Sequence, residues 1–151
     1  MLDLRFPTAL QAMLSLALAR EQGVARLSSG DLAEGLSANP SLVRKLTGQL
    51  AAHGLVTTTL GKSGGVALAK TPEAISLADI YVASTAGKSL WTARQDIPHR
   101  CVVSSNIESF FSDLASETDV AVKATLAKTT LAGALAELHT RDRRRGKPGR
   151  K

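Results

Sequence analysis

Arg44 and Lys45 are neighbouring basic residues in the segment 40–53, and Ser41 precedes them by about one helical turn. Arginine and lysine bind phosphate oxygens and the acceptor atoms of guanine, and a serine hydroxyl can bond to either group. The alternative is a solvated helix face, since charged surface residues need no ligand. The hairpin expected beside this segment favours contact with DNA.

That hairpin is expected because Gly61-Lys62-Ser63-Gly64-Gly65 lies between two β-prone runs, 55–60 and 66–69. A hairpin that directly follows a DNA-reading helix is called a wing. Its glycines let the backbone approach a phosphate or enter a minor groove, and Lys62 adds charge. A nucleotide-binding phosphate loop is excluded, because the glycines lack its spacing and no Lys-Ser or Lys-Thr pair opens a helix there.

The residue types used in catalysis form no recognisable set. His53, His99 and His139 are scattered, and none has metal-ligand spacing to a cysteine or a carboxylate. No nucleophile is paired with a base. The sequence therefore predicts a protein that is not an enzyme and has neither a metal site nor a cofactor.

Cys101 is the single cysteine. One cysteine can form neither an internal disulfide nor a four-cysteine zinc site. His99 and Arg100 beside it would lower the pKa of the thiol, which is the setting of a redox sensor. The alternative is a small buried hydrophobic residue, which is how most free cysteines behave.

Helical periodicity predicts three helices before the hairpin, over residues 7–20, 28–36 and 40–53. Ser28 or Ser29 can cap the second, and Asn39 can cap the third. Two short helices joined by a brief turn form a helix-turn-helix, whose second helix enters the major groove. The outer face of that second helix is expected to carry Ser41, Arg44, Lys45, Thr47 and Gly48.

The chain after the hairpin is also predicted to be helical. A helix over 76–86 is followed by an irregular segment, 87–105, and Asn106 caps a long helix. A last helix starts after Thr129 or Thr130. A long exposed apolar helix on a small domain needs a partner surface, and a second copy is the simplest source. The expected dimerisation residues are Ile107, Phe110, Phe111 and Leu114.

The formal net charge of +6 is unevenly distributed. Residues 1–72 carry seven Lys/Arg and four Asp/Glu, residues 73–140 carry five and eight, and residues 141–151 carry seven and one. We predict a mainly α fold with a small β-hairpin wing: a winged helix-turn-helix DNA-binding domain over 1–72, linker and dimerisation helices over 73–140, and a disordered basic tail over 141–151. The tail either adds non-specific DNA affinity or only aids solubility.

The composition is 44% hydrophobic but only 3% aromatic, so the core must consist mostly of Leu, Ala and Val. Such chains favour helices over sheets. The N-terminus lacks a signal-peptide pattern, and the apolar segment 9–19 is too short to span a bilayer. We expect a soluble cytoplasmic protein without a membrane partner.

Residues 27–69 resemble the DNA-binding half of the Rrf2 family of winged-helix regulators. The matching residues are Leu32-Ala33-Glu34, Asn39 to Leu46, Gly54-Leu55-Val56, Gly61 to Gly65, Leu68-Ala69 and Ile75 to Ile80, with a weaker likeness through Cys101-Val102-Val103 and Asn106-Ile107 to about Leu138. The resemblance implies a homodimer on a palindromic operator in double-stranded DNA. The expected DNA-binding residues are Ser41, Arg44 and Lys45, the wing residues Lys62, Ser63, Gly64 and Gly65, and the helix-starting residues Ser28 and Asn39.

The sequence departs from the family pattern at two places. Many members have arginine just before the first wing glycine, and this chain has Leu60. Members that bind an iron–sulfur cluster have three cysteines between the linker helix and the long helix, and this chain has Cys101 alone. The chain therefore resembles the branch without a cluster.

Two function hypotheses follow. The first is a sequence-specific transcriptional regulator, a dimeric repressor that responds to an unidentified small-molecule or redox effector. Tyr81 and Trp91 either line a pocket for that effector or pack in the core. The second hypothesis is a winged-helix protein-interaction module that uses Phe110 and Phe111 and has only non-specific affinity for nucleic acid.

Overall fold

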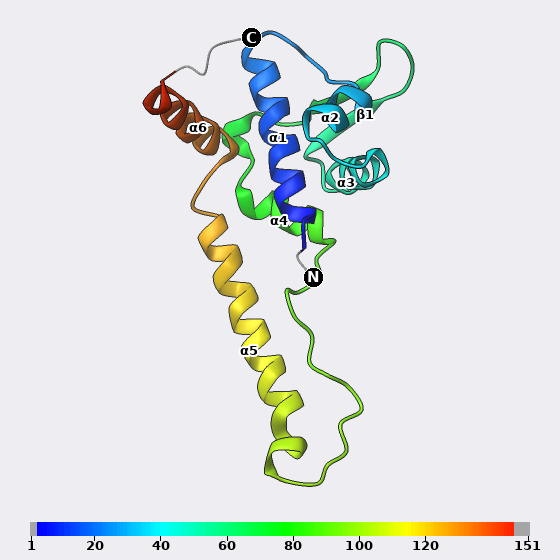
Figure 1. Cartoon of the computed structure of the whole chain (residues 1–151), viewed down its shortest axis with the longest axis vertical. Helices are drawn as coiled ribbons and strands as arrows, with labels where there is room; N and C mark the ends of the chain where they lie inside the picture. The colour runs from blue at the N-terminus through cyan, green and yellow to red at the C-terminus, as the bar shows by residue number, and fades with distance from the viewer. Residues whose placement is uncertain (1–2, 147–151) are drawn as a thin grey trace.

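The computed structural model describes residues 3–146. Along the chain its elements are α1 (Arg5–Glu21), α2 (Ser29–Gly35), α3 (Pro40–Ala52), β1 (Val56–Thr59), β2 (Gly65–Leu68), the 3-10 turn η1 (Pro72–Ala74), α4 (Leu77–Thr85), α5 (Val102–Leu126) and α6 (Leu131–Arg145). The mainly α fold with a β-hairpin wing is therefore confirmed. Figure 1 shows a helical body from which α5 projects.

One hydrophobic core holds the body together. Alanine and methionine on α1 meet the leucines of α3, with Val66 of the hairpin beside them. Each fully buried leucine, isoleucine or valine stabilises such a core by about 1.5–3 kcal/mol. Ile75, Ile80, Leu131 and Leu135 belong to the same core. Hence the boundary predicted after residue 72 is not a boundary in packing, because α4 and α6 complete the core of the N-terminal unit.

The hairpin is a two-stranded antiparallel sheet in which Val56 pairs with Leu68 and Thr59 with Gly65. Leu27 extends it, because the backbone groups of Leu27 and Val66 exchange two hydrogen bonds of 3.0 and 2.8 Å. Gly65 has φ 144°, and a Cβ there would lie 2.5 Å from the carbonyl oxygen of Leu27. A Cβ on Gly64 would lie 2.1 Å from the carbonyl oxygen of Thr59. Both glycines are thus required by the hairpin itself.

Helix α5 begins earlier than the sequence predicts. Its first residue is Val102, and Cys101 occupies the N-cap position. Asn106 lies inside the helix, where its side-chain amide donates to the carbonyl oxygen of Val102 at 2.7 Å. The prediction that Asn106 caps the helix was therefore wrong. The Ser104 side chain instead accepts a hydrogen bond from the backbone N–H of Cys101 at 3.0 Å and so completes a capping box whose N-cap lies five residues before Asn106.

The prediction of a disordered tail from residue 141 was wrong for residues 141–145. Helix α6 continues to Arg145. Arg141 donates to Glu137 one turn earlier at 2.8 Å, and arginines in the last turn interact favourably with the negative end of the helix dipole. Residues 147–151 of the predicted tail lie outside the described part of the chain. Within residues 3–146, no helix is both long enough and apolar enough to cross a membrane.

Candidate nucleic-acid interface

Helix α3 is fixed at its start by Asn39, whose side-chain oxygen accepts a hydrogen bond from the Ser41 N–H at 2.8 Å. Its inner face packs through Val43, Leu46 and Leu50. Thr47 also lies on that face, and its hydroxyl donates to the carbonyl oxygen of Val43 at 3.0 Å. The expectation that Thr47 belongs to the outer face was therefore wrong, since it lies one turn after the buried Val43.

The outer face of α3 presents Ser41, Arg44 and Lys45, all of them exposed. A guanidinium nitrogen of Arg44 lies 3.4 Å from the Ser41 hydroxyl oxygen. Helix α2 braces this face from behind, because its Leu32 and Ala33 form a second buried cluster with Val43 of α3 and Ala12 of α1. The three side chains are thus presented together on a supported helix.

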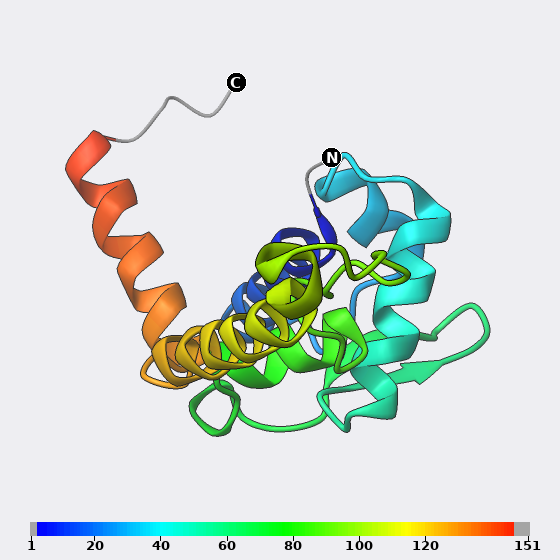
Figure 2. The ribbon, with the colours of Figure 1, turned by 90° about the horizontal axis from the view of Figure 1, so that it is seen from below.

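The wing lies on the same side of the molecule as α3, as Figures 1 and 2 both show. Its tip turns at Gly61, which has φ 98°, and the Gly64 N–H donates to the Gly61 carbonyl oxygen at 3.1 Å. Lys62 and Ser63 are exposed at this tip. Leu60 beside them is 97% exposed. A recognition helix and a wing therefore face solvent together.

Ser28 caps α2, and its hydroxyl oxygen accepts a hydrogen bond from the Asp31 N–H at 3.0 Å. Because Leu27 pairs with Val66, Ser28 lies beside Gly65, at the loop end of the hairpin. Sequence reasoning missed Arg26 in this region. Its guanidinium donates to the Thr59 hydroxyl at 2.8 Å across 33 residues of chain. A lone arginine outside any motif carries no sequence signal of such a contact.

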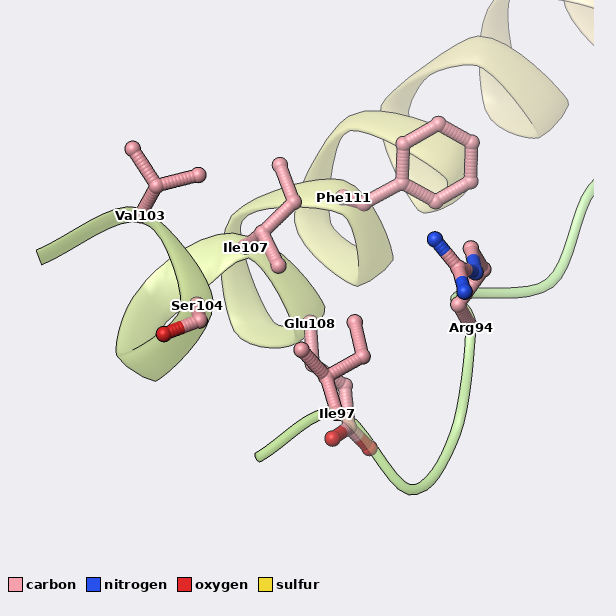
Figure 3. Close-up of a pocket in the computed structure, with 7 residues that line it drawn as sticks. All are labelled: Arg94, Ile97, Val103, Ser104, Ile107, Glu108 and Phe111. Atoms are coloured by element: carbon pink, nitrogen blue, oxygen red, sulfur yellow. The ribbon is translucent and has the colours of Figure 1, made fainter. Parts of the chain in front are cut away.

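The four predicted dimerisation residues do not share one environment. Phe110 is 64% exposed and Leu114 is 43% exposed, whereas Ile107 and Phe111 are partly buried. The Phe111 ring lies 6.4 Å from that of Trp91, centroid to centroid, within the same chain. Ile107 and Phe111 also line a cavity of about 350 Å³ with Arg94, Ile97, Val103, Ser104 and Glu108. Figure 3 shows these side chains of α5 next to Arg94 and Ile97 of the segment that precedes the helix.

Cys101 is exposed, so the alternative of a small buried hydrophobic residue was wrong. Hydrogen bonding to the thiolate at the start of α5 lowers the pKa of Cys101, chiefly through the Ser104 N–H, then the Ser104 hydroxyl and the Val103 N–H. The Cys101 sulfur lies 3.5 Å from the Ser104 hydroxyl oxygen. The helix start, rather than the neighbouring His99 and Arg100 invoked from the sequence, therefore accounts for the lowered pKa.

The two aromatic residues considered for an effector pocket differ in role. Tyr81 is buried, and its ring meets that of Phe6 edge-on with centroids 5.4 Å apart. Burial, followed by the nearby carboxylate of Asp119, raises the pKa of Tyr81. Trp91 is half exposed. Tyr81 is thus a core residue.

A model of the Rrf2 family, described as an iron-dependent transcriptional regulator, matches residues 2–137. The chain belongs to the Rrf2 family. Rrf2 proteins are transcription regulators that bind DNA, not enzymes. Comparison with curated protein sequences gave no match.

Solved structures similar to this Rrf2 chain include a proposed transcriptional regulator from Lactobacillus plantarum, with 26% identity, a TM-score of 0.76 and coverage of 93% of both chains. CymR, the global cysteine regulator of B. subtilis, has 20% identity and a TM-score of 0.62, with 91% of this chain and 97% of CymR covered. IscR from T. potens has 21% identity and a TM-score of 0.60, with 91% and 88% covered. The last two likenesses show the winged-helix fold.

The iron in the family description has no matching donor set in this Rrf2 chain. Its sequence contains a single cysteine, whereas iron–sulfur clusters are held mainly by several thiolates. Among residues 3–146, no group of three or more His, Cys, Asp or Glu side chains could hold a metal ion. The described residues therefore do not fit an iron centre.

Proposed function

We propose that this Rrf2 protein is a sequence-specific transcriptional repressor that acts in the cytoplasm and binds an inverted-repeat operator as a homodimer. The observation that carries the proposal is the exposed face of α3 with its serine, arginine and lysine, next to a wing on the same side of the molecule. A braced helix with a polar face fits the major groove, and a glycine-rich hairpin fits the adjacent minor groove.

In this proposal Arg44 and Lys45 bond to base edges or phosphates at the N-terminal half of α3, and Ser41 supports Arg44 from one turn earlier. Ser28 and Asn39 use one oxygen each to cap a helix. The Ser28 hydroxyl proton and the Asn39 amide protons are still available to phosphate oxygens. In the wing, Lys62 and Ser63 supply the polar contacts, while Gly64 and Gly65 maintain its shape.

Helix α5 offers a surface for a second subunit. Val103, Ile107, Phe110 and Leu114 follow one another at spacings of four, three and four residues, which places them on one stripe of the helix. Val103, Phe110 and Leu114 are 64%, 64% and 43% exposed. A two-fold axis across α5 would cover both copies of this stripe with the same residues. We expect this dimer to place two α3 helices in successive major grooves about one DNA turn apart.

The proposal is tested by incubating the full-length protein with fragmented genomic DNA at physiological salt and sequencing the bound fragments. We expect enrichment of a few sites that share an inverted repeat. A variant with Arg143, Arg144 and Arg145 changed to glutamine removes the positive charge at the end of α6 and should enrich the same sites. Arg44→Ala should enrich these sites less strongly, because it loses discrimination at one base pair of each half-site.

A different outcome would favour the interaction module. In that outcome the wild type would bind DNA without enriching any site, and the triple glutamine variant would lose that binding. That pair of results would contradict the regulator proposal, because the affinity would then come from the end of α6 alone.

We also propose that Cys101 is the effector-responsive group. The thiolate is favoured at an exposed helix start, and this is the form that attacks the O–O bond of a peroxide. The attack gives a sulfenic acid and releases water after protonation.

A further inference from the structure

Arg26 lies one residue before the point where the chain joins the wing. Leu27 pairs with Val66, and Val66 points into the core. Since side chains alternate along extended chain, Arg26 lies on the opposite, outer side of the hairpin. It is exposed there.

The guanidinium of Arg26 crosses β2 to reach β1. Its Nη1 donates to the Thr59 hydroxyl at 2.8 Å. Two strand spacings of about 4.8 Å separate these backbones, which an extended arginine side chain can span. Of the two residues of β2 next to Val66, Ala67 has only a methyl group and Gly65 has no side chain. Nothing on β2 therefore obstructs the crossing.

This contact uses one of five N–H donors on a group that remains charged at any physiological pH. Among residues 3–146, no carboxylate lies within ion-pair distance of Arg26. The hydrogen bond fixes the position of the guanidinium, so less side-chain entropy is lost when it binds a ligand. The contact also places a cation at the end of β1, one residue before the uncharged and 97% exposed Leu60.

We propose that Arg26 is part of the DNA-binding surface and contacts a phosphate beside the minor groove that receives the wing. The inference rests on the proposed function and adds a residue outside both the recognition helix and the wing loop. Arginine suits this task, because its planar fork can donate two parallel hydrogen bonds to a phosphate while a third N–H stays on Thr59. Lys62 would then contact the DNA backbone from the wing loop, and Arg26 would contact it from the sheet.

The test measures binding of the full-length protein to its selected operator and to an unrelated duplex, over a range of salt concentrations. We expect Arg26→Ala to weaken both by roughly tenfold, because a phosphate contact carries no sequence information. The slope of log K against log salt should become shallower by about one. Arg26→Lys should keep the wild-type slope.

Two variants make the result specific. Arg20→Ala is the matched control, since Arg20 is also exposed and also makes one hydrogen bond, of 3.4 Å to the carbonyl oxygen of Lys70. It should bind as the wild type does. Thr59→Val removes the acceptor but keeps the charge, and it should weaken binding less than Arg26→Ala without changing the slope.

The inference is overturned if Arg26→Ala binds as tightly as Arg20→Ala. It is also overturned if Thr59→Val and Arg26→Ala lose equal affinity and neither changes the salt slope, because Arg26 would then only support the wing. A wild-type protein that prefers no operator would instead contradict the proposed function.

Discussion

The Tyr81 hydroxyl donates to the Asp119 carboxylate at 3.5 Å and joins α4 to α5. Asp119 is 9% exposed and also pairs with Lys123 at 2.7 Å. Helix α4 packs on α1 and α3 in the body, whereas α5 projects from it (Figure 1). This contact therefore lies in the C-terminal part of the proposed dimerisation helix, where α5 packs against α4.

Tyr81→Phe should lower the free energy of unfolding by about 1 kcal/mol, because a buried acceptor loses a donor while the ring contact with Phe6 is kept. Urea denaturation measures the change. Tyr81→Leu is the comparison and should cost more, because it also removes the aromatic contact. A phenylalanine variant as stable as the wild type would mean that the hydroxyl contributes nothing.

The same tyrosine gives a prediction for alkaline pH. Burial and the charge of Asp119 raise the pKa of Tyr81 above its usual value of 10.0. A raised pKa means that the folded state holds the phenolic proton more tightly than the unfolded state does. The resulting stability is fully present below pH 10 and is lost as the pH rises through the folded-state pKa. The wild type should therefore lose stability relative to Tyr81→Phe above about pH 10. The prediction is contradicted if the free energies of unfolding of the wild type and of Tyr81→Phe change in parallel from pH 8 to 11.

Arg44→Ala should relax sequence preference by about 1–3 kcal/mol at one base pair of each half-site, because one guanidinium reads one position. Competition binding with single-base operator variants measures it. Arg141→Ala is a suitable control, as this exposed arginine on α6 pairs with Glu137. Equal discrimination by the Arg44 variant and the wild type would show that Arg44 does not read a base.

Phe110→Asp should give a folded monomer. The ring is 64% exposed in the single chain, so its loss costs little in folding, but a charge on the stripe would be buried in the dimer without a partner. Sedimentation velocity and circular dichroism measure the two properties. Val120→Asp is the control, because Val120 is equally exposed at 65% but lies off the stripe. A Phe110→Asp dimer would place the interface elsewhere.

Cys101→Ser should abolish any response of operator binding to peroxide. Ser104→Ala should raise the pKa of the Cys101 thiol towards its ordinary value, since Ser104 supplies the hydroxyl part of the stabilisation. The rate of alkylation at neutral pH should then fall. If peroxide releases the Cys101→Ser variant from DNA as it does the wild type, Cys101 is not the sensor.

The helix-turn-helix and the wing could be predicted from local signals. Asn39 followed by Pro40 marks the start of α3, and the paired glycines mark the hairpin, because caps and turns depend on a few adjacent residues. The start of α5 could not be predicted in the same way. Asn106 is a better capping residue type than Cys101, but Ser104 makes the earlier start favourable by bonding back to the backbone of Cys101.

Contacts between residues distant in sequence could not be predicted from local signals. Arg26 meets Thr59 only because Leu27 joins the sheet. Leu131 and Leu135 of α6 enter the core beside α1 because backbone hydrogen bonds tie Leu77 to Thr129 and Leu131 to Ile75. Neither arrangement follows from periodicity or composition, since both depend on tertiary pairing.

In the proposed complex, a dimer reads DNA with two copies of α3. Hydroxyl-radical and methylation-protection footprinting of the full-length protein on its selected operator tests it most directly. We expect two protected major-groove segments with centres about 10 base pairs apart, and minor-groove protection by the wings. Arg44→Ala should lose the guanine protection in both segments. One protected segment alone, or uniform protection without a groove pattern, would contradict the account.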